Sequence, residues 1–594
     1  MIARASNALP VQARDGRGDR AEILAALKEC AKRKDLARGK RIHAAAVECG
    51  LDSDLFVGSS LVSMYSRCGS VARSRMVFDA MEFLDRVSWN SLVLGYAENG
   101  GGEVALKLFL AMQDEGHCSP DSSTFVAAIK ACSSLSERES GMEVEGMDRR
   151  IKVESLEKGM RIHRQAWSSG FERDIFVANA LIHAYAKCGS LVDATKVFHA
   201  MPRRDEVSWN ALMVGAVDNG EPELALQLLV SMNSEGRVAP NPRTFLAAIK
   251  ACGCCAVKED AKGIDSRLVK LASLEKGMAL HSLACENKCD SSVFVASALV
   301  DMYAKCGSIA DAQRVFDSMQ DRNVISWTSM IFGCVDNSQD ELALELFRRM
   351  VEEKRCPLDA WTFVAALKAC GNLAALETGR EIHEQIRDAG LEREASIAAT
   401  LVDFYGRCGS MDEALEAFQL SSQEDMVAWT ALVAGYSRQG DTPRVLELFQ
   451  ALLDKGLRPD VMIFSSLLSA CSHAGLVDLG KRYFEEMSSK FGLAPGIHHY
   501  HCVVDLLSRS NRLEEAVAMV ARMPFEPTLV TWTTVLAGCH KWKNSMVGRM
   551  AFQRLIALDR RLDSAYALMA NIYGSLGLWR ERQEIQAMRS MNVL

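Results

Sequence analysis

The amino-acid sequence predicts an all-α fold, an α-solenoid of stacked helix-turn-helix repeats. A basic residue followed by Cys-Gly-Ser occurs four times, with its cysteine at Cys68, Cys188, Cys306 and Cys408. A second cysteine recurs in a Leu- and Ala-rich stretch, at Cys30, Cys132, Cys252, Cys370 and Cys471. A Ser-Trp or Ala-Trp pair ends at Trp89, Trp209, Trp327 and Trp429. All three series return after 101 to 120 residues, and self-similarity of this kind is the signature of a solenoid.

The shared unit is about 102 residues long, and two copies exceed it by 18 and 16 residues. The extra residues are 136–153 and 254–269, which interrupt a segment that reads without interruption from Ala369. Both stretches carry charges of either sign. They are therefore predicted to be loops that are inserted at the same point of the repeat and project from the stack.

Each unit divides into three segments, of which 360–394, 395–425 and 324–359 are examples with 35, 31 and 36 residues. Within a segment the apolar residues keep the i, i+3, i+4 spacing of an amphipathic helix, as in the stretch that begins at Leu299. Gly307 falls where a helix needs a left-handed residue to stop. Every segment is thus predicted to be a helix, a tight turn and a second helix, which must stack on its neighbours to bury its apolar face.

Three of the Cys-Gly-Ser copies place a serine three residues before an acidic residue, a spacing typical of a capping pair at a helix start. These pairs are Ser190 with Asp193, Ser308 with Asp311 and Ser410 with Glu413. The first copy has Arg73 at the acidic position, so its cap is expected to be weaker.

Composition limits the possible functions. The net charge is −7, so nucleic-acid binding would have to rest on a local basic stripe. No apolar run approaches the 18 residues of a membrane span. The 19 cysteines are odd in number and lie in helical patterns, which favours reduced, buried thiols over a disulfide framework. Residues 1–19 contain three arginines and are interpreted as part of a targeting peptide.

The alternating segment lengths, together with "VSWNALMVG" at 207–215 and "YAKCGS" at 185–190, resemble the pentatricopeptide repeat family. The resemblance is to the plant-type subclass that mixes long, short and standard repeats, and it covers 20–594. It implies an array of about 14 repeats over 20–528. Two stretches in 529–594, "VTWTTVLAGCHKWKN" and "YALMANIYGSLGLWRERQEIQAMRSMNV", resemble the family's E-type motifs. The resemblance also implies a right-handed solenoid.

In function, the resemblance implies a sequence-specific single-stranded RNA-binding protein of the mitochondrion or chloroplast. Such a protein would recognise sites of C-to-U editing and recruit a deaminase in trans. The family reads one base per repeat through a residue early in the first helix and the last residue of the same repeat. The matching pairs are Ser59 with Asp85, Asn90 with Asp121, Asn179 with Asp205, Asn210 with Asn241, Ser297 with Asn323, Thr328 with Asp359, and Thr430 with Asp460.

The family's pairing scheme gives each pair a base, with the RNA 5′ end at the N-terminal repeats. The expected bases are G for Ser59/Asp85, U for Asn90/Asp121 and Asn179/Asp205, C or U for Asn210/Asn241, A for Ser297/Asn323, and G for Thr328/Asp359 and Thr430/Asp460. Ala399 with Asp425 lacks an early side-chain donor and should read poorly. The long repeats place Val126, Leu246 and Val364 at the early position and are not expected to discriminate. Turn and cap usage would explain the final residue of each pair, but not the restricted choice at the early position.

The basic residue before each Cys-Gly is implied by the resemblance to meet RNA phosphates, which would supply one cation for every three repeats. The positions are Arg67, Lys187, Lys305 and Arg407, with Arg509 at the equivalent place of the last short repeat. A solvated surface charge is the alternative.

No catalytic or metal site is expected, and no cofactor. The deaminase signature needs His-x-Glu and a downstream Cys-x-x-Cys, and no histidine is followed two residues later by Glu. The single Cys-x-x-Cys joins Cys252 to Cys255 at the edge of an insertion, where packing is favoured over zinc. Recurring histidines at His43, His163, His281 and His383 are interpreted as packing residues. Because the chain ends at Leu594 with the E-type motifs, it is expected to be an adaptor without a deaminase and not an enzyme.

A helical protein-binding scaffold of the tetratricopeptide type is the alternative function. Its length and architecture would be similar. The alternating repeat lengths and the restricted reading residues favour RNA, whereas a mixed or apolar surface would favour a peptide.

Overall fold

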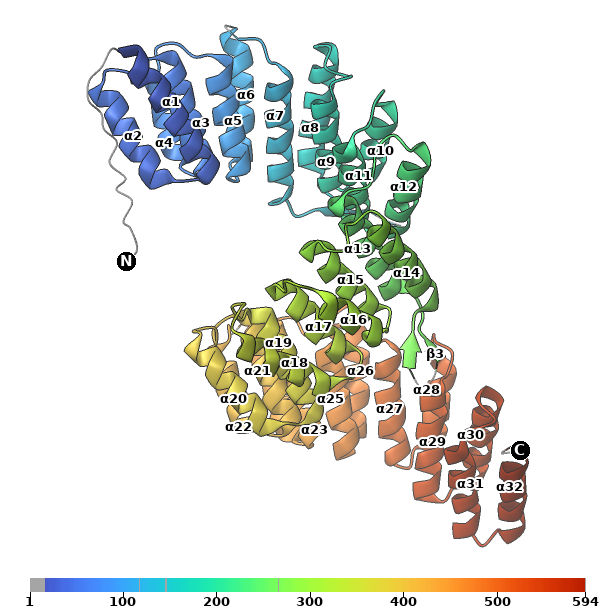
Figure 1. Cartoon of the computed structure of the whole chain (residues 1–594). Helices are drawn as coiled ribbons and strands as arrows, with labels where there is room; N and C mark the ends of the chain where they lie inside the picture. Colours follow the sequence, from blue (N-terminus) through green and yellow to red (C-terminus); the bar gives the residue numbers. More distant parts are fainter. Residues whose placement is uncertain (1–15, 117, 145–146, 265–266, 423, 593–594) are drawn as a thin grey trace. The chain divides into compact units, whose positions relative to one another are not determined.

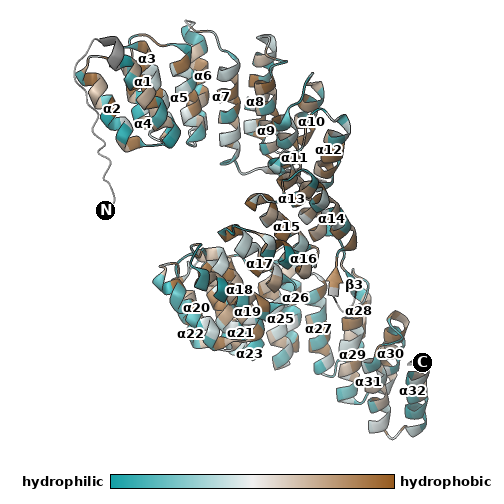
Figure 2. Cartoon of the chain, in the orientation of Figure 1, coloured by the Kyte–Doolittle hydropathy of each residue, from teal (hydrophilic) through white to brown (hydrophobic). Residues whose placement is uncertain are grey.

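The computed structural model describes residues 16–116, 118–144, 147–264, 267–422 and 424–592. These residues form a predominantly α-helical protein of two compact units, and the boundary along the chain falls between Arg322 and Asn323. Within each unit the helices stand side by side in chain order (Figure 1). Most helices carry apolar residues on one side and hydrophilic residues on the other (Figure 2), as expected of amphipathic helices that bury one face. None of the described helices is long and apolar enough to span a membrane.

The first unit begins with seven helices, whose bounds are α1 (Gly16–Arg33), α2 (Leu36–Glu48), α3 (Leu55–Arg67), α4 (Val71–Ala80), α5 (Arg86–Glu98), α6 (Gly102–Glu115) and α7 (Ser122–Ser136). Two strands follow, β1 (Met142–Val144) and β2 (Met147–Ile151). The next helices are α8 (Val153–Ser168), α9 (Ile175–Lys187), α10 (Leu191–Ala200), α11 (Glu206–Asp218), α12 (Pro222–Glu235) and α13 (Pro242–Lys258). The unit ends with β3 (Lys262–Ile264), β4 (Arg267–Val269), α14 (Leu271–Glu286), α15 (Val293–Lys305) and α16 (Ile309–Ser318).

The second unit contains only helices in its described part. Its first eight are α17 (Val324–Asp336), α18 (Asp340–Glu353), α19 (Ala360–Leu373), α20 (Leu376–Asp388), α21 (Ala395–Cys408), α22 (Met411–Leu420), α23 (Met426–Gln439) and α24 (Thr442–Asp454). Its last eight are α25 (Val461–Ala474), α26 (Val477–Ser489), α27 (Ile497–Arg509), α28 (Leu513–Arg522), α29 (Leu529–Trp542), α30 (Ser545–Leu558), α31 (Asp563–Ser575) and α32 (Trp579–Asn592).

The helices of each unit form two layers. Odd-numbered helices, the first of each repeat, contact the next odd-numbered helix, as α7 does with α9 and α9 with α11. Even-numbered helices mainly contact the first helices of their own and the following repeat. The predicted repeat boundaries agree with this arrangement, because α17, α19 and α21 begin at the first residues of the three segments. The predicted solenoid of helix-turn-helix repeats is therefore confirmed.

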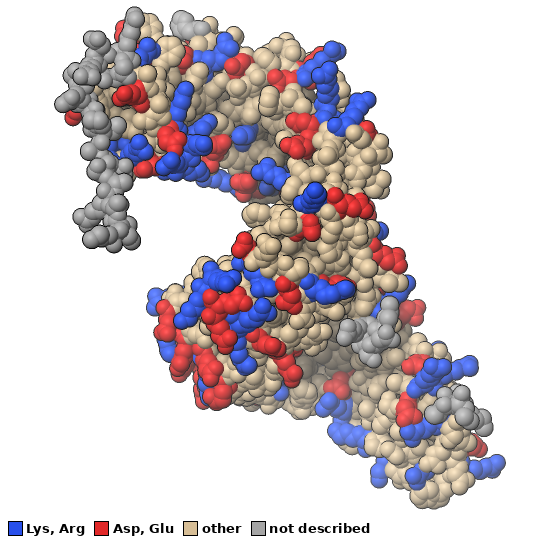
Figure 3. All heavy atoms as spheres, viewed as in Figure 1, with Lys and Arg blue, Asp and Glu red and all other residues tan. Residues whose placement is uncertain are grey.

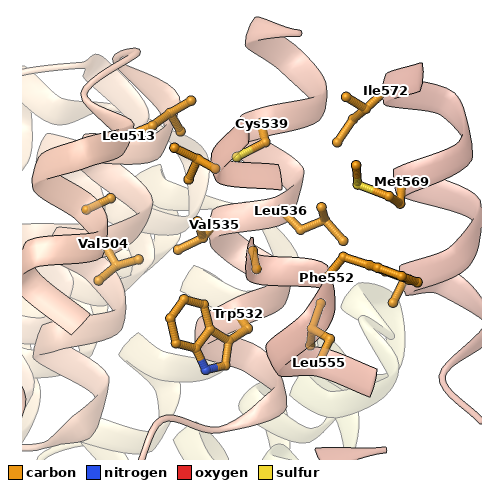
Figure 4. Close-up of a cluster of buried hydrophobic side chains, with 14 of the residues drawn as sticks. Val504, Leu513, Trp532, Val535, Leu536, Cys539, Phe552, Leu555, Met569 and Ile572 are labelled. Carbon is orange, nitrogen blue, oxygen red and sulfur yellow. The ribbon is translucent and has the colours of Figure 1, made fainter. Parts of the chain in front are cut away.

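The packing continues through the C-terminal helices. Trp532, Val535 and Cys539 of α29 pack with Phe552 of α30 and Met569 of α31 in one buried cluster. Figure 4 shows these side chains converging between the helices. Helix α29 contacts both α27 and α31, so residues 529–592 extend the same two-layer stack.

The helix ends follow the predicted chemistry, with one difference. Gly307 has φ of 85°, in the left-handed region, as expected for a residue that stops a helix. The Ser190 hydroxyl donates to the Asp193 carboxylate at 2.7 Å, and Ser308 and Ser410 bond Asp311 and Glu413 in the same way. None of the three serines accepts a backbone N–H with its side chain. The pairs therefore link two side chains at the helix start and do not form the full capping box.

The prediction that the two insertions are loops is wrong. Strands β1 and β2 pair antiparallel, as do β3 and β4, and the first residues of the second insertion continue helix α13 to Lys258. At the base of the first hairpin, the Glu139 carboxylate accepts the Glu154 backbone N–H at 2.9 Å and the Ser155 hydroxyl at 2.6 Å. Glu259 accepts the equivalent bonds from Ala272 and Ser273 in the second hairpin. Each hairpin is thus closed by a carboxylate at a helix N-terminus, which such a position favours.

Both hairpins dock on the Cys-Gly turn of the next repeat. The Lys152 backbone N–H donates to the Cys188 carbonyl at 3.0 Å, and Lys270 bonds Cys306 at 3.0 Å in the same way. A Cβ on Gly189 would lie 2.6 Å from the Arg150 carbonyl oxygen. The hairpins therefore pack against backbone, which a glycine makes accessible.

Gly189→Ala should lower the stability of the first unit by about 3 kcal/mol, because φ of 86° disfavours a side chain and the Cβ would clash with β2. Gly69→Ala is the matched control, since Gly69 has φ of 78° but its nearest neighbour is the flexible Asn99 side chain at 3.4 Å. It should cost about 1 kcal/mol. Urea denaturation followed by circular dichroism measures both, and equal midpoints for the two variants would contradict the docking role of the glycine.

Candidate nucleic-acid interface

The predicted reading residues lie in pairs where two neighbouring repeats meet. The early residue is on a first helix, and its partner is the N-cap of the next first helix, as Asn179 on α9 and Asp205 before α11 are. Five of the seven predicted pairs are joined by a direct hydrogen bond. These are Ser59 to Asp85 at 2.9 Å, Asn90 to Asp121 at 3.1 Å, Asn179 to Asp205 at 3.2 Å, Asn210 to Asn241 at 3.3 Å and Thr430 to Asp460 at 3.4 Å.

In the Thr328/Asp359 pair a further hydroxyl lies between the two residues. The Thr328 hydroxyl is 2.9 Å from the Thr362 hydroxyl, which donates to Asp359 at 2.6 Å. The Ser297 hydroxyl donates to the Val293 carbonyl of its own helix. Asn323 belongs to the second unit, where its side chain caps α17 by accepting the Ser326 N–H.

The hydrogen bonds fix how the asparagine amides are turned. Burial alone would raise the pKa of Asp121, but hydrogen bonds from the Thr124 backbone and hydroxyl and from Asn90 hold this pKa below its usual value. Asp205 also has a lowered pKa, again because hydrogen bonds from Ser208 and Asn179 outweigh burial. Both carboxylates are therefore ionised at neutral pH and can only accept, so the amide NH₂ must face them.

The amide oxygens consequently point away from the carboxylates. The side-chain oxygens of Asn90, Asn179 and Asn210 are buried and accept no hydrogen bond from any described residue. A buried acceptor without a donor is unfavourable. A ligand that presents an N–H group at these places would satisfy it.

Sequence reasoning missed a series of exposed apolar side chains. Each lies three residues before a reading residue, on the same face one turn earlier. Val207 before Asn210 is 51% exposed and Phe176 before Asn179 is 69% exposed. The complete series is Phe56, Val87, Phe176, Val207, Phe294, Ile325 and Val427. Their fixed spacing from the predicted reading residues was the available signal. The three phenylalanines of the series are suited to stacking on bases, and the four aliphatic side chains offer apolar contact surface.

One hollow contains a predicted base-reading pair, an exposed apolar side chain and a predicted phosphate residue. A cavity of about 510 Å³ between α9, α11 and α13 is lined by the predicted reading pair Asn210 and Asn241, by Val207, and by the predicted phosphate residue Lys187. A base-sized ligand in this hollow would reach the amides, the apolar side chain and the cation at the same time.

The five predicted phosphate residues occupy equivalent places at the ends of first helices, at Arg67, Lys187, Lys305, Arg407 and Arg509. Lys305, Arg407 and Arg509 are each ion-paired with an aspartate one turn earlier. On the face shown in Figure 3, basic side chains lie among acidic ones in both units. Three of the five predicted phosphate residues are therefore ion-paired within the described part of the chain.

The recurring histidines and cysteines have packing roles. Nδ1 of each histidine lies 2.8 to 3.0 Å from a tyrosine hydroxyl, in the pairs His43–Tyr65, His163–Tyr185, His281–Tyr303 and His383–Tyr405. Burial lowers the pKa of each of these histidines. Burial likewise raises the pKa of Cys188 to about 11. The Cys252 thiol donates to the Ser273 carbonyl and Cys255 to Glu223, and the described residues contain no cluster of three or more side chains that could hold a metal.

Comparison with known proteins identifies the repeats. The family model for the PPR repeat matches residues 87–117, 176–205, 207–237, 294–324, 325–354, 399–423 and 462–490. A pentatricopeptide repeat domain model matches 419–474, and an E motif model matches 542–593.

Three relatives from Arabidopsis thaliana are similar over most of the chain. Pentatricopeptide repeat-containing protein At1g15510, chloroplastic, is 34% identical over 96% of this chain and 61% of its own length. At3g02330, mitochondrial, is 32% identical over 94% of this chain and 60% of its own length. At2g33680 is 34% identical over 95% of this chain and 87% of its own length. The chain thus spans about 60% of the length of the first two relatives.

Among solved structures, the chain is similar to the pentatricopeptide repeat protein PPR10 in complex with an 18-nt psaJ RNA element. The TM-score is 0.57 at 16% identity, and the match covers 98% of this chain and 85% of the other. PPR10 from maize gives a TM-score of 0.51 at 16% identity over 98% and 95% of the two chains. At this identity the likeness concerns the fold, and it agrees with the solenoid described above.

Proposed function

The chain belongs to the pentatricopeptide repeat family, and from this premise we propose that it binds single-stranded RNA in a sequence-specific manner. The observation that carries the proposal is the hollow between α9, α11 and α13. There an apolar side chain, a pair of amides and a lysine line one cavity. Stacking, base-edge hydrogen bonding and phosphate contact are the three interactions by which proteins hold unpaired nucleotides.

The hydrogen-bond geometry supports reading of base edges. In the Asn179/Asp205 pair the Asn179 amide NH₂ donates a hydrogen bond to the Asp205 carboxylate, and the amide oxygen remains as an acceptor without a donor. Uracil offers an N3–H donor on its Watson–Crick edge, which would satisfy this oxygen. The equivalent arrangement at Asn90 and Asn210 leaves the same kind of acceptor at those places. The distinction between individual bases follows the family's pairing scheme.

The apolar series gives a direct test of RNA binding. Val207→Ser should weaken binding of a single-stranded RNA by up to about fivefold, because it removes an apolar contact with a base, for which about 1 kcal/mol, the lower end of the range for aromatic stacking, is an upper bound. Val192→Ser on α10 is the matched control, since Val192 is 63% exposed but lies on a second helix. Fluorescence anisotropy with labelled single-stranded RNA, duplex RNA and peptide pools measures the effect.

RNA affinity that falls no further with Val207→Ser than with the control Val192→Ser would argue against contact of Val207 with a base. No binding of single-stranded RNA, with binding of peptides in its place, would favour the protein-binding scaffold and contradict the proposed function.

We further propose that the RNA target lies in an organelle and that the chain marks a site of C-to-U editing there, recruiting a deaminase in trans. The E motif match at 542–593 supports this role, as do the words chloroplastic and mitochondrial in the names of the relatives. Sequencing of organellar transcripts from plants that lack the protein tests it. C-to-U conversion should be lost at one or a few sites of these transcripts. Unchanged conversion at every site would contradict the proposed role in editing.

A further inference from the structure

The five equivalent cations at the ends of the short-repeat first helices differ in the residue one turn before them. That residue is Ser63 before Arg67 and His183 before Lys187, but it is an aspartate in the other three repeats. The aspartates are Asp301 before Lys305, Asp403 before Arg407 and Asp505 before Arg509. The i, i+4 spacing on a helix brings such residues into contact.

The structure shows that all three aspartates hold their cation. The distances from the cationic nitrogen to the carboxylate oxygen are 2.7 Å for Lys305–Asp301, 2.7 Å for Arg407–Asp403 and 2.7 Å for Arg509–Asp505. Arg438 of α23 also lies 3.3 Å from Asp403. The single negative charge of Asp403 therefore offsets only one of the positive charges of Arg407 and Arg438. The Ser472 hydroxyl donates to Asp505 at 2.7 Å.

Arg67 and Lys187 have no aspartate one turn earlier. Neither makes an ion pair with any described residue. The pKa of His183 is lowered by burial and then by the charges of Lys187 and Lys130, so His183 is neutral at neutral pH and does not compensate Lys187. Asp218 lines the same hollow as Lys187 but is not within ion-pair distance of it.

Exposed i, i+4 ion pairs contribute little to protein stability, but they reduce the net positive charge that an RNA phosphate encounters at that position. An unpaired cation attracts phosphate and releases a counterion when it binds. A cation that already holds a carboxylate must break that pair or present a neutral dipole. Equivalent positions of the repeat should therefore not contribute equally to RNA binding.

We propose that Asp301, Asp403 and Asp505 attenuate the phosphate contacts of their repeats, so that among these five cations Arg67 and Lys187 make the stronger phosphate contacts. The aspartates act through the cations and are positioning residues that do not touch RNA themselves. This inference rests on the proposed RNA-binding function.

Lys187 and Lys305 form a matched pair for the test. Each is the last residue of its helix, and each is followed by a Cys-Gly turn on which a hairpin docks. The probe is a random-sequence single-stranded RNA pool of about 15 nucleotides, roughly one per repeat. Affinity is measured at several salt concentrations, because the slope of log affinity against log salt counts phosphate contacts.

Lys187→Ala should reduce the magnitude of this slope by about 0.7, the value for one phosphate contact with a single strand. Lys305→Ala should reduce it by less than half as much. Asp301→Ser, which installs the residue that Ser63 supplies in the first repeat, should steepen the slope by the remainder of one contact, which is more than half of about 0.7. Ser63→Asp should have the opposite effect at Arg67.

The double variant Asp301→Ser/Lys305→Ala separates the proposal from a general charge effect. The gain from Asp301→Ser must vanish when Lys305 is absent, as in a double-mutant cycle. An unchanged slope in Asp301→Ser, or a gain that persists without Lys305, would overturn the inference. Failure of the parent protein to bind the pool at any salt concentration would instead overturn the proposed function. Circular dichroism verifies that each variant is folded.

Discussion

Trp209→Ala should destabilise the first unit by about 4 kcal/mol, the usual cost of emptying a large buried aromatic site. Trp209 is 2% exposed and packs edge-to-face on Phe198, with 4.8 Å between the ring centroids. The Arg204 guanidinium lies 4.7 Å from the centre of the Phe198 ring. The side chain thus fills the junction between α10 and α11, and no neighbouring group can move into its place without breaking these contacts.

Urea denaturation of the intact chain, followed by circular dichroism, measures this effect. Trp167→Ala is the matched control, since Trp167 lies in the same unit but is 56% exposed, and it should change stability by about 0.5 kcal/mol. Equal midpoints for the two variants would mean that Trp209 does not hold the repeat junction. The Phe78–Trp89 and Phe418–Trp429 pairs have the same geometry, so Trp89→Ala should repeat the result.

Asn179→Ser should change the base preferred at one position of the RNA from U to G. The variant would recreate the Ser59/Asp85 pair, in which a hydroxyl lies 2.9 Å from the carboxylate and no amide oxygen is left over. Each mismatched base costs about 1 kcal/mol, by analogy with the lower end of the range for DNA recognition. The variant should therefore prefer G over U at that position by about fivefold, where the parent shows the reverse.

Competition between two RNAs that differ only at that base measures the switch. The exchange of a single side chain at a half-buried site should leave the preferences at all other positions unchanged, which serves as an internal control. A uniform loss of affinity without any change of preference would mean that Asn179 supports the fold and does not read a base.

The repeats were predictable because their signals are local. The boundaries follow from the spacing of cysteines, tryptophans and apolar residues, and Gly307 takes the left-handed conformation that its place after the helix requires. The hairpins were not predictable from local sequence. Their strands are three to five residues long and depend on tertiary contacts, such as the Glu139 carboxylate at the helix start and the Gly189 backbone beneath β2.

The candidate site was predicted only in part. The reading pairs came from the family resemblance, and the hydrogen bonds between Asn179 and Asp205 and their equivalents place the predicted partners together. The exposed residues such as Val207 were overlooked because an apolar residue in a helical pattern is usually assigned to the core. The ion pairs of Lys305 and its equivalents could have been found, since an aspartate four residues earlier is visible in the sequence.

We propose that successive residue pairs of this chain read successive bases of a single RNA strand. Selection of bound sequences from a random single-stranded RNA pool tests it most directly. The enriched RNAs should share one motif, in which G and U for Ser59/Asp85 and Asn90/Asp121 precede U and a pyrimidine for Asn179/Asp205 and Asn210/Asn241 in the 5′ to 3′ direction. Pools that bind without any shared motif, or a motif in the reverse order, would contradict the claim.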